Sequence, residues 1–449
     1  MKFLDYLVYL QKSYCILQSE ILFELNAVGL KISKSNLSHK LKGDRLISEE
    51  EFEIILKTID PTDEEKQELR ELYKIYIYGE QNYKEVCRVK DYIESFSYSR
   101  TSILSQKTID LDEITYIGDK NLLDEILVYI LSENWGKSPI RILCQPEYQT
   151  LIEILSYLGK ETSGDVRHIV CLNKESDMDN NVYNINCLIN ITKLAFGNNL
   201  YSVKYFHDKV NSHCNSFSIF PFFIISGERM LLISSDFSYG FLSTDKEFIS
   251  AYIRDFDRIY NKSEKMFTVL NNDLDYIKTC SFLEMQAHEK YYVLQNKRCL
   301  LFGIDKKTIV EYVNKDNYNI SEILEIQKQR AENTIPQGFI LYNDPDCENF
   351  INNGIADDWP ADLCIPIPKE FRSTVILNSQ KDPLHKNIQI KKGYIHFPKE
   401  LMIACYDSGS VLISYKKNLN SPRLVVTERS LYKSIKLFCE YVLRFESDS

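Results

Sequence analysis

Two helix-capping signals divide the first eighty residues of the chain into short helices. Ser48 is followed by Glu51, and Thr62 by Glu65, so each pair has the Ser/Thr-x-x-Glu spacing of a capping box at a helix N-terminus. Asp60-Pro61 lies between the two pairs and should end the first of these helices, because proline cannot continue a helix. Short helices with tight joints predict a compact all-helical domain over residues 1–78.

Three more helices are expected before these two. Apolar residues recur at helical spacing over Phe3–Leu10, and a second helix is expected over Gln18–Ala27. Ser33 is suited to N-cap a third helix from Lys34 to about Leu41. Gly43 is suited to end that helix, since glycine adopts the left-handed cap conformation at little cost. The apolar side chains expected to face the core there are Ile32, Leu37 and Leu41.

Basic residues are concentrated around the third helix. Residues 31–45 carry five lysine or arginine side chains against a single acid, Asp44, whereas the helices on either side are rich in acids. The whole chain has a net charge of -10, which argues against a protein that coats nucleic acid over its entire surface. An acidic total charge is still compatible with one basic face. On such a face, lysine and arginine neutralise phosphates and short polar side chains reach base edges. The expected DNA-binding residues are Ser33, Lys34, Ser35, Asn36, Ser38, His39, Lys40, Lys42 and Arg45.

The run from Lys31 to Gly43 resembles the recognition-helix segment of the lambda-repressor/Cro-like helix-turn-helix family. That segment has a small residue or Gly, then Ile, Ser, x, Ser, x, an apolar residue and Ser, with Gly closing the helix. Lys31 stands where the family often has glycine, so Gly29 is expected to make the turn. The resemblance is confined to residues 1–78. It implies that Ser33 and Lys34 lie near phosphate and the first base. It places Asn36, Ser38, His39 and Lys40 on the outer part of the helix.

Other interpretations of this domain stay open. A five-helix domain could carry a solvated basic face that binds nothing, or it could bind another protein. For the DNA-binding interpretation, one recognition helix reads only a few base pairs, and the resembled family usually pairs two half-sites about one helical turn apart. A homodimer on double-stranded DNA is therefore expected.

Residues 79–120 are predicted to be a helical connector and linker. Glu80 to about Phe96 has the pattern of a charged amphipathic helix, which could connect domains, dimerise or simply pack on a surface. Residues 97–106 are rich in Ser and Thr and are the best candidate for a linker.

From residue 121 the pattern changes to helices that alternate with buried strands, which is typical of an α/β domain with a partly parallel sheet. We expect one such domain over 121–265 and a second α/β region over 266–449. A hairpin, 217–225 and 230–234, and a capped helix from Thr244 to Ile259 should close the first domain. The strands expected before them are Ile140–Cys144, Val166–Leu172 and Tyr201–Phe206, and the helices are 122–131, 148–158 and 185–196.

The C-terminal end repeats this hairpin and helix. Residues 401–405 and 411–414 mirror 222–226 and 231–234, and each pair is followed by a helix expected to start at a threonine, Thr244 or Thr427. The repeat suggests two related α/β halves about a pseudo-twofold axis.

That layout resembles the phospholipase D-like fold in topology. The catalytic motif of that family, His-x-Lys with Asp after four residues, does not survive here. Cys214 stands where the acid should follow His207 and Lys209, and Lys399 is at the wrong spacing from His396. The resemblance therefore implies a catalytically inactive version of the fold.

Familiar signatures of catalysis, metal binding and cofactor binding are missing from the sequence. It has no glycine-rich phosphate or dinucleotide loop, no nucleophile elbow, no His-Glu-x-x-His motif and no Cys-x-x-Cys pair among its 12 cysteines. Isolated cysteines in apolar stretches fit a reducing compartment. No stretch reaches the ~20 apolar residues of a membrane-spanning helix. We expect no catalytic residues, no metal, no cofactor, no membrane partner and a cytoplasmic location.

The leading hypothesis is a repressor-like DNA-binding transcriptional regulator. Its C-terminal region would sense a small-molecule or peptide ligand, dimerise, or do both. One alternative is a phosphodiesterase-like effector enzyme that carries a helix-turn-helix targeting domain. Another is an interaction protein whose helical domain binds a second protein.

Overall fold

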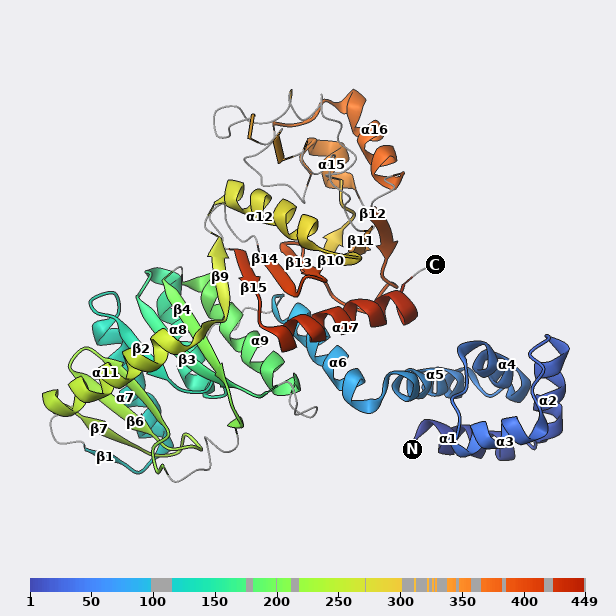
Figure 1. The fold of residues 1–449 in the computed structure, drawn as a ribbon, viewed down its shortest axis with the longest axis horizontal. Coiled ribbons are helices and arrows are strands. Elements are labelled where there is room, and N and C mark those ends of the chain that lie inside the picture. Colours follow the sequence, from blue (N-terminus) through green and yellow to red (C-terminus); the bar gives the residue numbers. More distant parts are fainter. Residues whose placement is uncertain are drawn as a thin grey trace. The chain divides into compact units, whose positions relative to one another are not determined.

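A computed structural model of the chain divides into two compact units, Met1–Lys84 and Glu85–Ser449 (Figure 1). We describe each unit by itself. The predicted linker, 97–106, lies outside the described residues from residue 98 onward. Apart from isolated positions between 311 and 328, the structure describes residues 1–97, 115–174, 181–198, 200–210, 218–270, 272–300, 337–344, 347–356, 365–381, 385–415 and 423–447.

The first unit is a bundle of short helices around one apolar core. Phe3, Phe52 and Tyr73 meet at its centre, and the rings of Phe52 and Tyr73 stack with centroids 4.2 Å apart. Such pairs add to the stabilisation from burial alone. Its helices are α1 (Phe3–Ser13), α2 (Gln18–Ala27), α3 (Lys34–Lys42), α4 (Glu49–Ile59) and α5 (Asp63–Tyr78), followed by the start of α6 (Glu80–Ser95).

The helix boundaries in this unit follow the predicted caps. The side chain of Ser33 accepts a hydrogen bond from the backbone N–H of Asn36, and Gly43 ends α3 in the left-handed conformation with φ 89°. Both capping boxes form, at the starts of α4 and α5. α4 ends at Ile59, directly before Asp60-Pro61. Because these caps are local hydrogen bonds between near neighbours, the sequence alone predicts them correctly.

The turn between α2 and α3 contains two left-handed residues. Gly29 has φ 94°, as expected of the residue that makes the turn, and Lys31 has φ 47°. Asn26 spans the turn, since its side chain accepts a hydrogen bond from the N–H of Ile32 and donates to the carbonyl of Ile32. The position where the resembled family often has glycine therefore does need a left-handed backbone, and here a lysine occupies it.

The second unit contains two mixed β-sheets. In the first sheet three strands are parallel and the others are antiparallel to their neighbours. α11 (Lys246–Lys262) covers one face, where Ile249 and Phe256 pack on Phe223 and Ile225. The strand order is β1 (Tyr116–Ile117), β7 (Gly240–Ser243), β6 (Arg229–Ile233), β5 (Phe222–Ser226), β2 (Ile140–Leu143), β3 (Val166–Leu172), β4 (Tyr201–His207) and β8 (Glu264–Lys265). The other helices of this half are α7 (Lys120–Asn134), α8 (Gln149–Glu161) and α9 (Asn181–Gly197).

The second sheet lies between two helices. α12 (Asp273–Gln286) packs on the face that carries Tyr291, and α17 (Arg429–Phe445) lies on the other side of the sheet (Figure 1), where Tyr292 reaches Glu440. Successive strand residues point to opposite faces, so β10 is buried on both sides. The order is β9 (Phe267–Leu270), β15 (Arg423–Val426), β14 (Ser410–Tyr415), β13 (Leu401–Tyr406), β10 (Lys290–Lys297), β11 (Gln337–Asp344) and β12 (His385–Gln389). Two helices, α15 (Glu348–Asn353) and α16 (Lys369–Gln380), connect β11 to β12.

The two sheets share one topology. Read from β1, the first seven strands of one sheet match the seven strands of the other in order and in direction, with β2, β3 and β4 corresponding to β10, β11 and β12. In both halves the hairpin is followed by one more strand and then by a long helix, α11 or α17. The observed architecture is an all-helical N-terminal region followed by two related α/β halves.

Several boundaries in this unit differ from the expectations. The hairpin begins at Phe222, five residues after the expected start, and the helices expected to start at Thr244 and Thr427 begin two residues later, at Lys246 and Arg429. Their N-caps are the acids Asp245 and Glu428, each of which accepts a backbone N–H three residues on. A carboxylate oxygen can accept this backbone N–H as a threonine hydroxyl does. Which of the two adjacent side chains caps the helix therefore depends on the backbone conformation between the strand and the helix. The expected domain and linker boundaries stay predictions.

Candidate nucleic-acid interface

α3 is anchored in the first unit by one apolar face. Leu37 and Leu41 are buried, as is Ile32 just before the helix, which confirms the predicted inward residues. The positions between them point outward because a helix repeats every 3.6 residues. A short polar helix therefore lies on the surface of a well-packed domain, held by three apolar anchors and its two caps.

The exposed side of α3 carries most of the predicted binding residues. Lys34 and Ser35 lie in its first turn and Lys42 at its end, and all three are exposed. Asn36 and Ser38 are half-buried, and His39 is exposed. Among the described residues, no ion pair is recorded for Lys34 or Lys42, so their ammonium groups face solvent.

Lys40 has a different environment from the other basic residues. Its ammonium group lies 2.8 Å from a carboxylate oxygen of Glu51 and 2.6 Å from the carbonyl oxygen of Leu46. The two charged side chains are only 14% and 10% exposed. Glu51 is also the capping residue of α4, since it accepts the N–H of Ser48. Lys40 thus joins α3 to the start of α4, and its charge is neutralised inside the domain.

Two other predicted residues are hydrogen-bonded to neighbours on the surface. Arg45 donates to the side-chain oxygen of Asn36 at 3.0 Å, and His39 Nδ1 lies 2.9 Å from a carboxylate oxygen of Asp44. Both pairs are exposed, where such contacts are weak and exchange readily. Any partner that uses Asn36, His39 or Arg45 must compete for these two separate hydrogen bonds.

The N-terminus of α3 is an electropositive site. Lys34 and Ser35 follow the N-cap Ser33, in the turn where backbone N–H groups point away from the helix and attract anions. Lys31, which is exposed, lies just before it. Lys31 belongs to the predicted basic segment but was not among the predicted binding residues. Its exposure beside this N-terminus adds it to the candidate interface.

The second unit contains the histidine of the incomplete phospholipase D-like motif. His207 ends β4, and its Nε2 lies 3.1 Å from Glu428, the N-cap of α17. Burial favours the protonated form of Glu428, but hydrogen bonds from His207, Ser430 and the N–H of Leu431 outweigh it and hold the pKa of this carboxyl below its usual range. The other oxygen of Glu428 accepts from Ser430, whose hydroxyl oxygen accepts from Asn184.

This cluster of hydrogen bonds connects the two α/β halves of the second unit. Each polar group bonds to a side chain or backbone group of the protein, and His207 is paired with a carboxylate rather than with a second histidine and a lysine. Within the described residues, no group of three or more His, Cys, Asp or Glu side chains is placed to hold a metal ion. Among the helices in those residues, none is long and apolar enough to cross a bilayer.

Comparisons with known proteins give little guidance for this chain. No protein-family model matches it. No curated protein matches it either. One similar solved structure, that of TrmBL2, is described as an archaeal chromatin protein with a novel mode of DNA binding. It is 10% identical with a TM-score of 0.23, and the match covers 58% of this chain and 99% of that one.

A second similar structure is a phosphatidylserine synthase from Haemophilus influenzae. It is also 10% identical with a TM-score of 0.23, and the match covers 81% of this chain and 91% of that one. At such scores neither likeness carries an argument about fold or function. The functional argument therefore rests on the residues of this chain.

Proposed function

We propose that this protein is a DNA-binding transcriptional regulator in which α3 is the recognition helix. The observation that carries the proposal is the arrangement of side chains along α3, with an apolar face in the core and Lys34, Ser35 and Lys42 in solvent. Lysines neutralise phosphates and short polar groups reach base edges. Double-stranded DNA is the proposed partner of this surface.

Binding to duplex fragments from the promoter region of the chain's own gene tests the proposal, with footprinting to locate the site. Lys34→Ala and Lys42→Ala should each weaken binding to all sequences and reduce the slope of log affinity against log salt by about 1. Lys57→Ala is the matched control, because Lys57 is an exposed lysine on α4. If all three variants bind like the wild type, α3 is not the interface.

Sequence preference is proposed to come from the neighbouring polar groups. Asn36→Ala and His39→Ala should lower affinity for the preferred site more than for random DNA, by about 1–3 kcal/mol where a base contact is lost. Asn36→Ala also frees Arg45, so its effect on random DNA should be small or favourable. Equal losses on both kinds of DNA would argue against base readout by these residues.

The proposed regulator acts as a homodimer. A recognition helix of nine residues reads only a few base pairs, and pairing two half-sites multiplies affinity. Sedimentation at micromolar concentration should give a dimer, at least in the presence of DNA. A monomer under both conditions would contradict this part of the proposal.

The second unit is proposed to be a non-catalytic body for sensing or dimerisation. A phosphodiesterase-like effector is the second candidate, because His207 with Glu428 is a histidine–carboxylate pair at the junction of two related halves. Acid–base attack on a phosphodiester calls for paired histidines with lysines close by. Turnover of phosphodiester, nucleic-acid or lipid substrates that disappears in His207→Ala or His396→Ala would favour the enzyme.

A further inference from the structure

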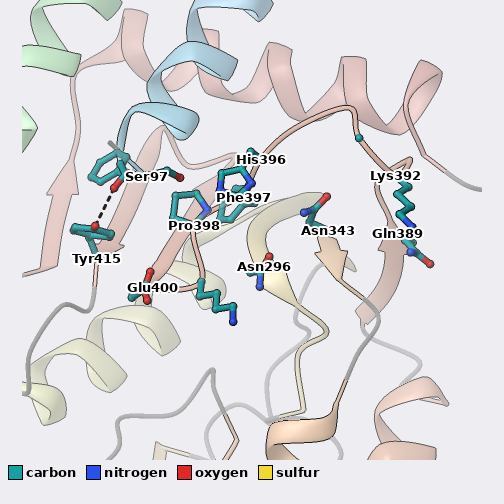
Figure 2. Close-up of a pocket in the computed structure, with 13 residues that line it drawn as sticks. Ser97, Asn296, Asn343, Gln389, Lys392, His396, Phe397, Pro398, Glu400 and Tyr415 are labelled. Carbon is teal, nitrogen blue, oxygen red and sulfur yellow. Dashed lines mark hydrogen bonds between the residues drawn. The ribbon is translucent and has the colours of Figure 1, made fainter. Parts of the chain in front are cut away.

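A cavity of about 760 Å³ opens at one edge of the second sheet (Figure 2). It lies where the parallel strands β10, β11 and β12 reach their carboxyl ends. The loop that leads from β12 to β13 and the end of β14 complete its wall. Crevices at the carboxyl ends of parallel strands are where open α/β sheets bind small ligands.

Each of the three parallel strands has a carboxamide side chain in its last two residues that lines this cavity. By the strand register Asn296 on β10 lies opposite Asn343 on β11, and Gln389 on β12 pairs with Tyr342, the residue before Asn343. All three line the cavity. Asn296 is 7% exposed. Within the described residues, no hydrogen bond is recorded for any of the three side chains. Asn343 and Gln389 are half-buried, so with Asn296 they present amide donors and acceptors to the cavity.

At the equivalent edge of the first sheet, the corresponding described side chains are bonded within the protein. By the shared topology, Asn173 corresponds to Asn343, and His207 corresponds to Gln389. Asn173 accepts the N–H of Val210 and also bonds to Asn184 through its backbone, and His207 pairs with Glu428. The start of α17 fills that edge. At this edge the two halves therefore differ, because the corresponding groups of the first half are bonded within the protein.

The charge and the apolar walls of the cavity limit the kinds of ligand that it can bind. Two lysines, Lys392 and Lys399, line it against one acid, Glu400. Phe397 and Tyr415 provide buried ring surface. A cavity with excess positive charge, amide donors and acceptors, and aromatic walls suits a molecule with an anionic group on a polar body.

We infer that this cavity binds a small organic anion, a carboxylate or a phosphate. Lys392 and Lys399 hold its charged group, and the three carboxamides hydrogen-bond its polar body. The inference that the cavity binds an anion is independent of what the first unit binds. The further inference that this binding regulates the protein rests on the proposed function.

Calorimetric titration of the full chain tests the inference, after a thermal-shift screen of organic phosphates, carboxylates and their neutral counterparts. Probe pairs include AMP with adenosine, glucose 6-phosphate with glucose, and citrate with glycerol. At least one anion should bind with a Kd below about 1 mM and about tenfold or more tighter than its neutral counterpart. The phosphates and the carboxylates form separate arms, so the anionic group is identified directly.

Variants then place the bound anion in the cavity. Gln389→Glu adds a carboxylate and Lys392→Ala removes a cation, and each should weaken the anion about tenfold or more. Lys381→Ala, which changes an exposed lysine outside the cavity, should leave affinity within about twofold. Unchanged melting temperatures without ligand show that the variants fold. Failure of every anion in the screen, or equal binding by all three variants, would overturn the inference whether or not the protein binds DNA.

Discussion

At the scale of single residues, the basic side chains around α3 have two distinct roles. Lys34 and Lys42 face solvent, whereas Lys40 is held between Glu51 and the carbonyl of Leu46. An inward lysine in a pair that is mostly shielded from water contributes to stability, because removing it leaves a carboxylate without its cation. Charge counting along the sequence treats these lysines as equivalent, although only some can reach a partner.

The first prediction concerns this pair. Lys40→Ala should destabilise the first unit by about 2 kcal/mol, because the Glu51 carboxylate stays largely buried without its cation. Lys40→Met with Glu51→Gln should recover part of the loss, since it removes both charges and keeps the lysine stem. Urea unfolding of the wild type, Lys40→Met, Glu51→Gln and the double variant forms a double-mutant cycle that measures the coupling. A loss of DNA affinity without a loss of stability would assign Lys40 to the interface instead.

The second prediction concerns the left-handed turn residue. Lys31→Gly should stabilise the first unit by about 1 kcal/mol relative to Lys31→Ala, since an L side chain is strained at φ 47° and glycine is not. Comparison with the alanine variant removes the effect of the lost charge. Equal melting temperatures for the two variants would mean that the turn relaxes at no cost.

At the scale of secondary-structure elements, internal hydrogen bonds join neighbouring strands. His168 on β3 is fully buried, and its Nε2–H donates to the carbonyl of Cys144 while its Nδ1 accepts from the hydroxyl of Tyr201 on β4. Burial lowers the pKa of His168 to about 4, against the opposing effect of the Cys144 carbonyl. The imidazole therefore stays neutral in the folded protein at pH values where an unfolded histidine is protonated.

The third prediction follows from that difference. Between about pH 6.5 and pH 4 the unfolded chain binds a proton at His168 and the folded chain does not, so stability falls as the pH falls through this window. From pH 7 to pH 5 the contribution of this residue should drop by about 2 kcal/mol. His168→Gln should lose this part of the pH dependence, as measured by denaturant unfolding at both pH values. Identical pH profiles for the two proteins would contradict the assignment.

At the scale of the whole molecule, α6 belongs to both units. It begins at Glu80 in the first unit, and from Glu85 onward it packs within the second. There Glu85 accepts from Ser434 of α17, and Glu94 accepts the N–H of His396. Tyr415 donates to the carbonyl of Phe96, and Figure 2 shows this contact at the wall of the cavity. A ligand in the cavity would thus touch the residues that hold the end of the helix.

The fourth prediction joins the two proposals. An anion that binds the cavity should change the DNA affinity of the full chain by about 5- to 150-fold, since allosteric coupling energies are typically about 1–3 kcal/mol. Lys392→Ala should abolish the change and keep the affinity of the ligand-free protein for DNA. Fluorescence anisotropy with and without the anion gives both quantities. An anion that binds without any effect on DNA affinity would separate the cavity from regulation.

The sequence by itself determined the elements that depend on near neighbours. α2, α3 and β3 begin where expected, because caps, glycine stops and hydrophobic periodicity act over a few residues. The matching hairpins near residues 222 and 401 also indicated the two related halves, since both consist of continuous apolar strands that are buried almost throughout.

Only the tertiary structure decided which side chains are available for a partner. Lys40 and Lys42 are two residues apart on a helix, yet one is held inward by Glu51, eleven residues further along the chain, while the other is exposed. Asn173 and Asn343 occupy equivalent positions, but within the described residues a bond to neighbours from distant segments is recorded only for Asn173. Such differences arise from contacts between residues far apart in the chain, and the pattern of the sequence does not encode them locally. The helical domain was therefore predictable, whereas the inward lysine and the anion cavity required the fold.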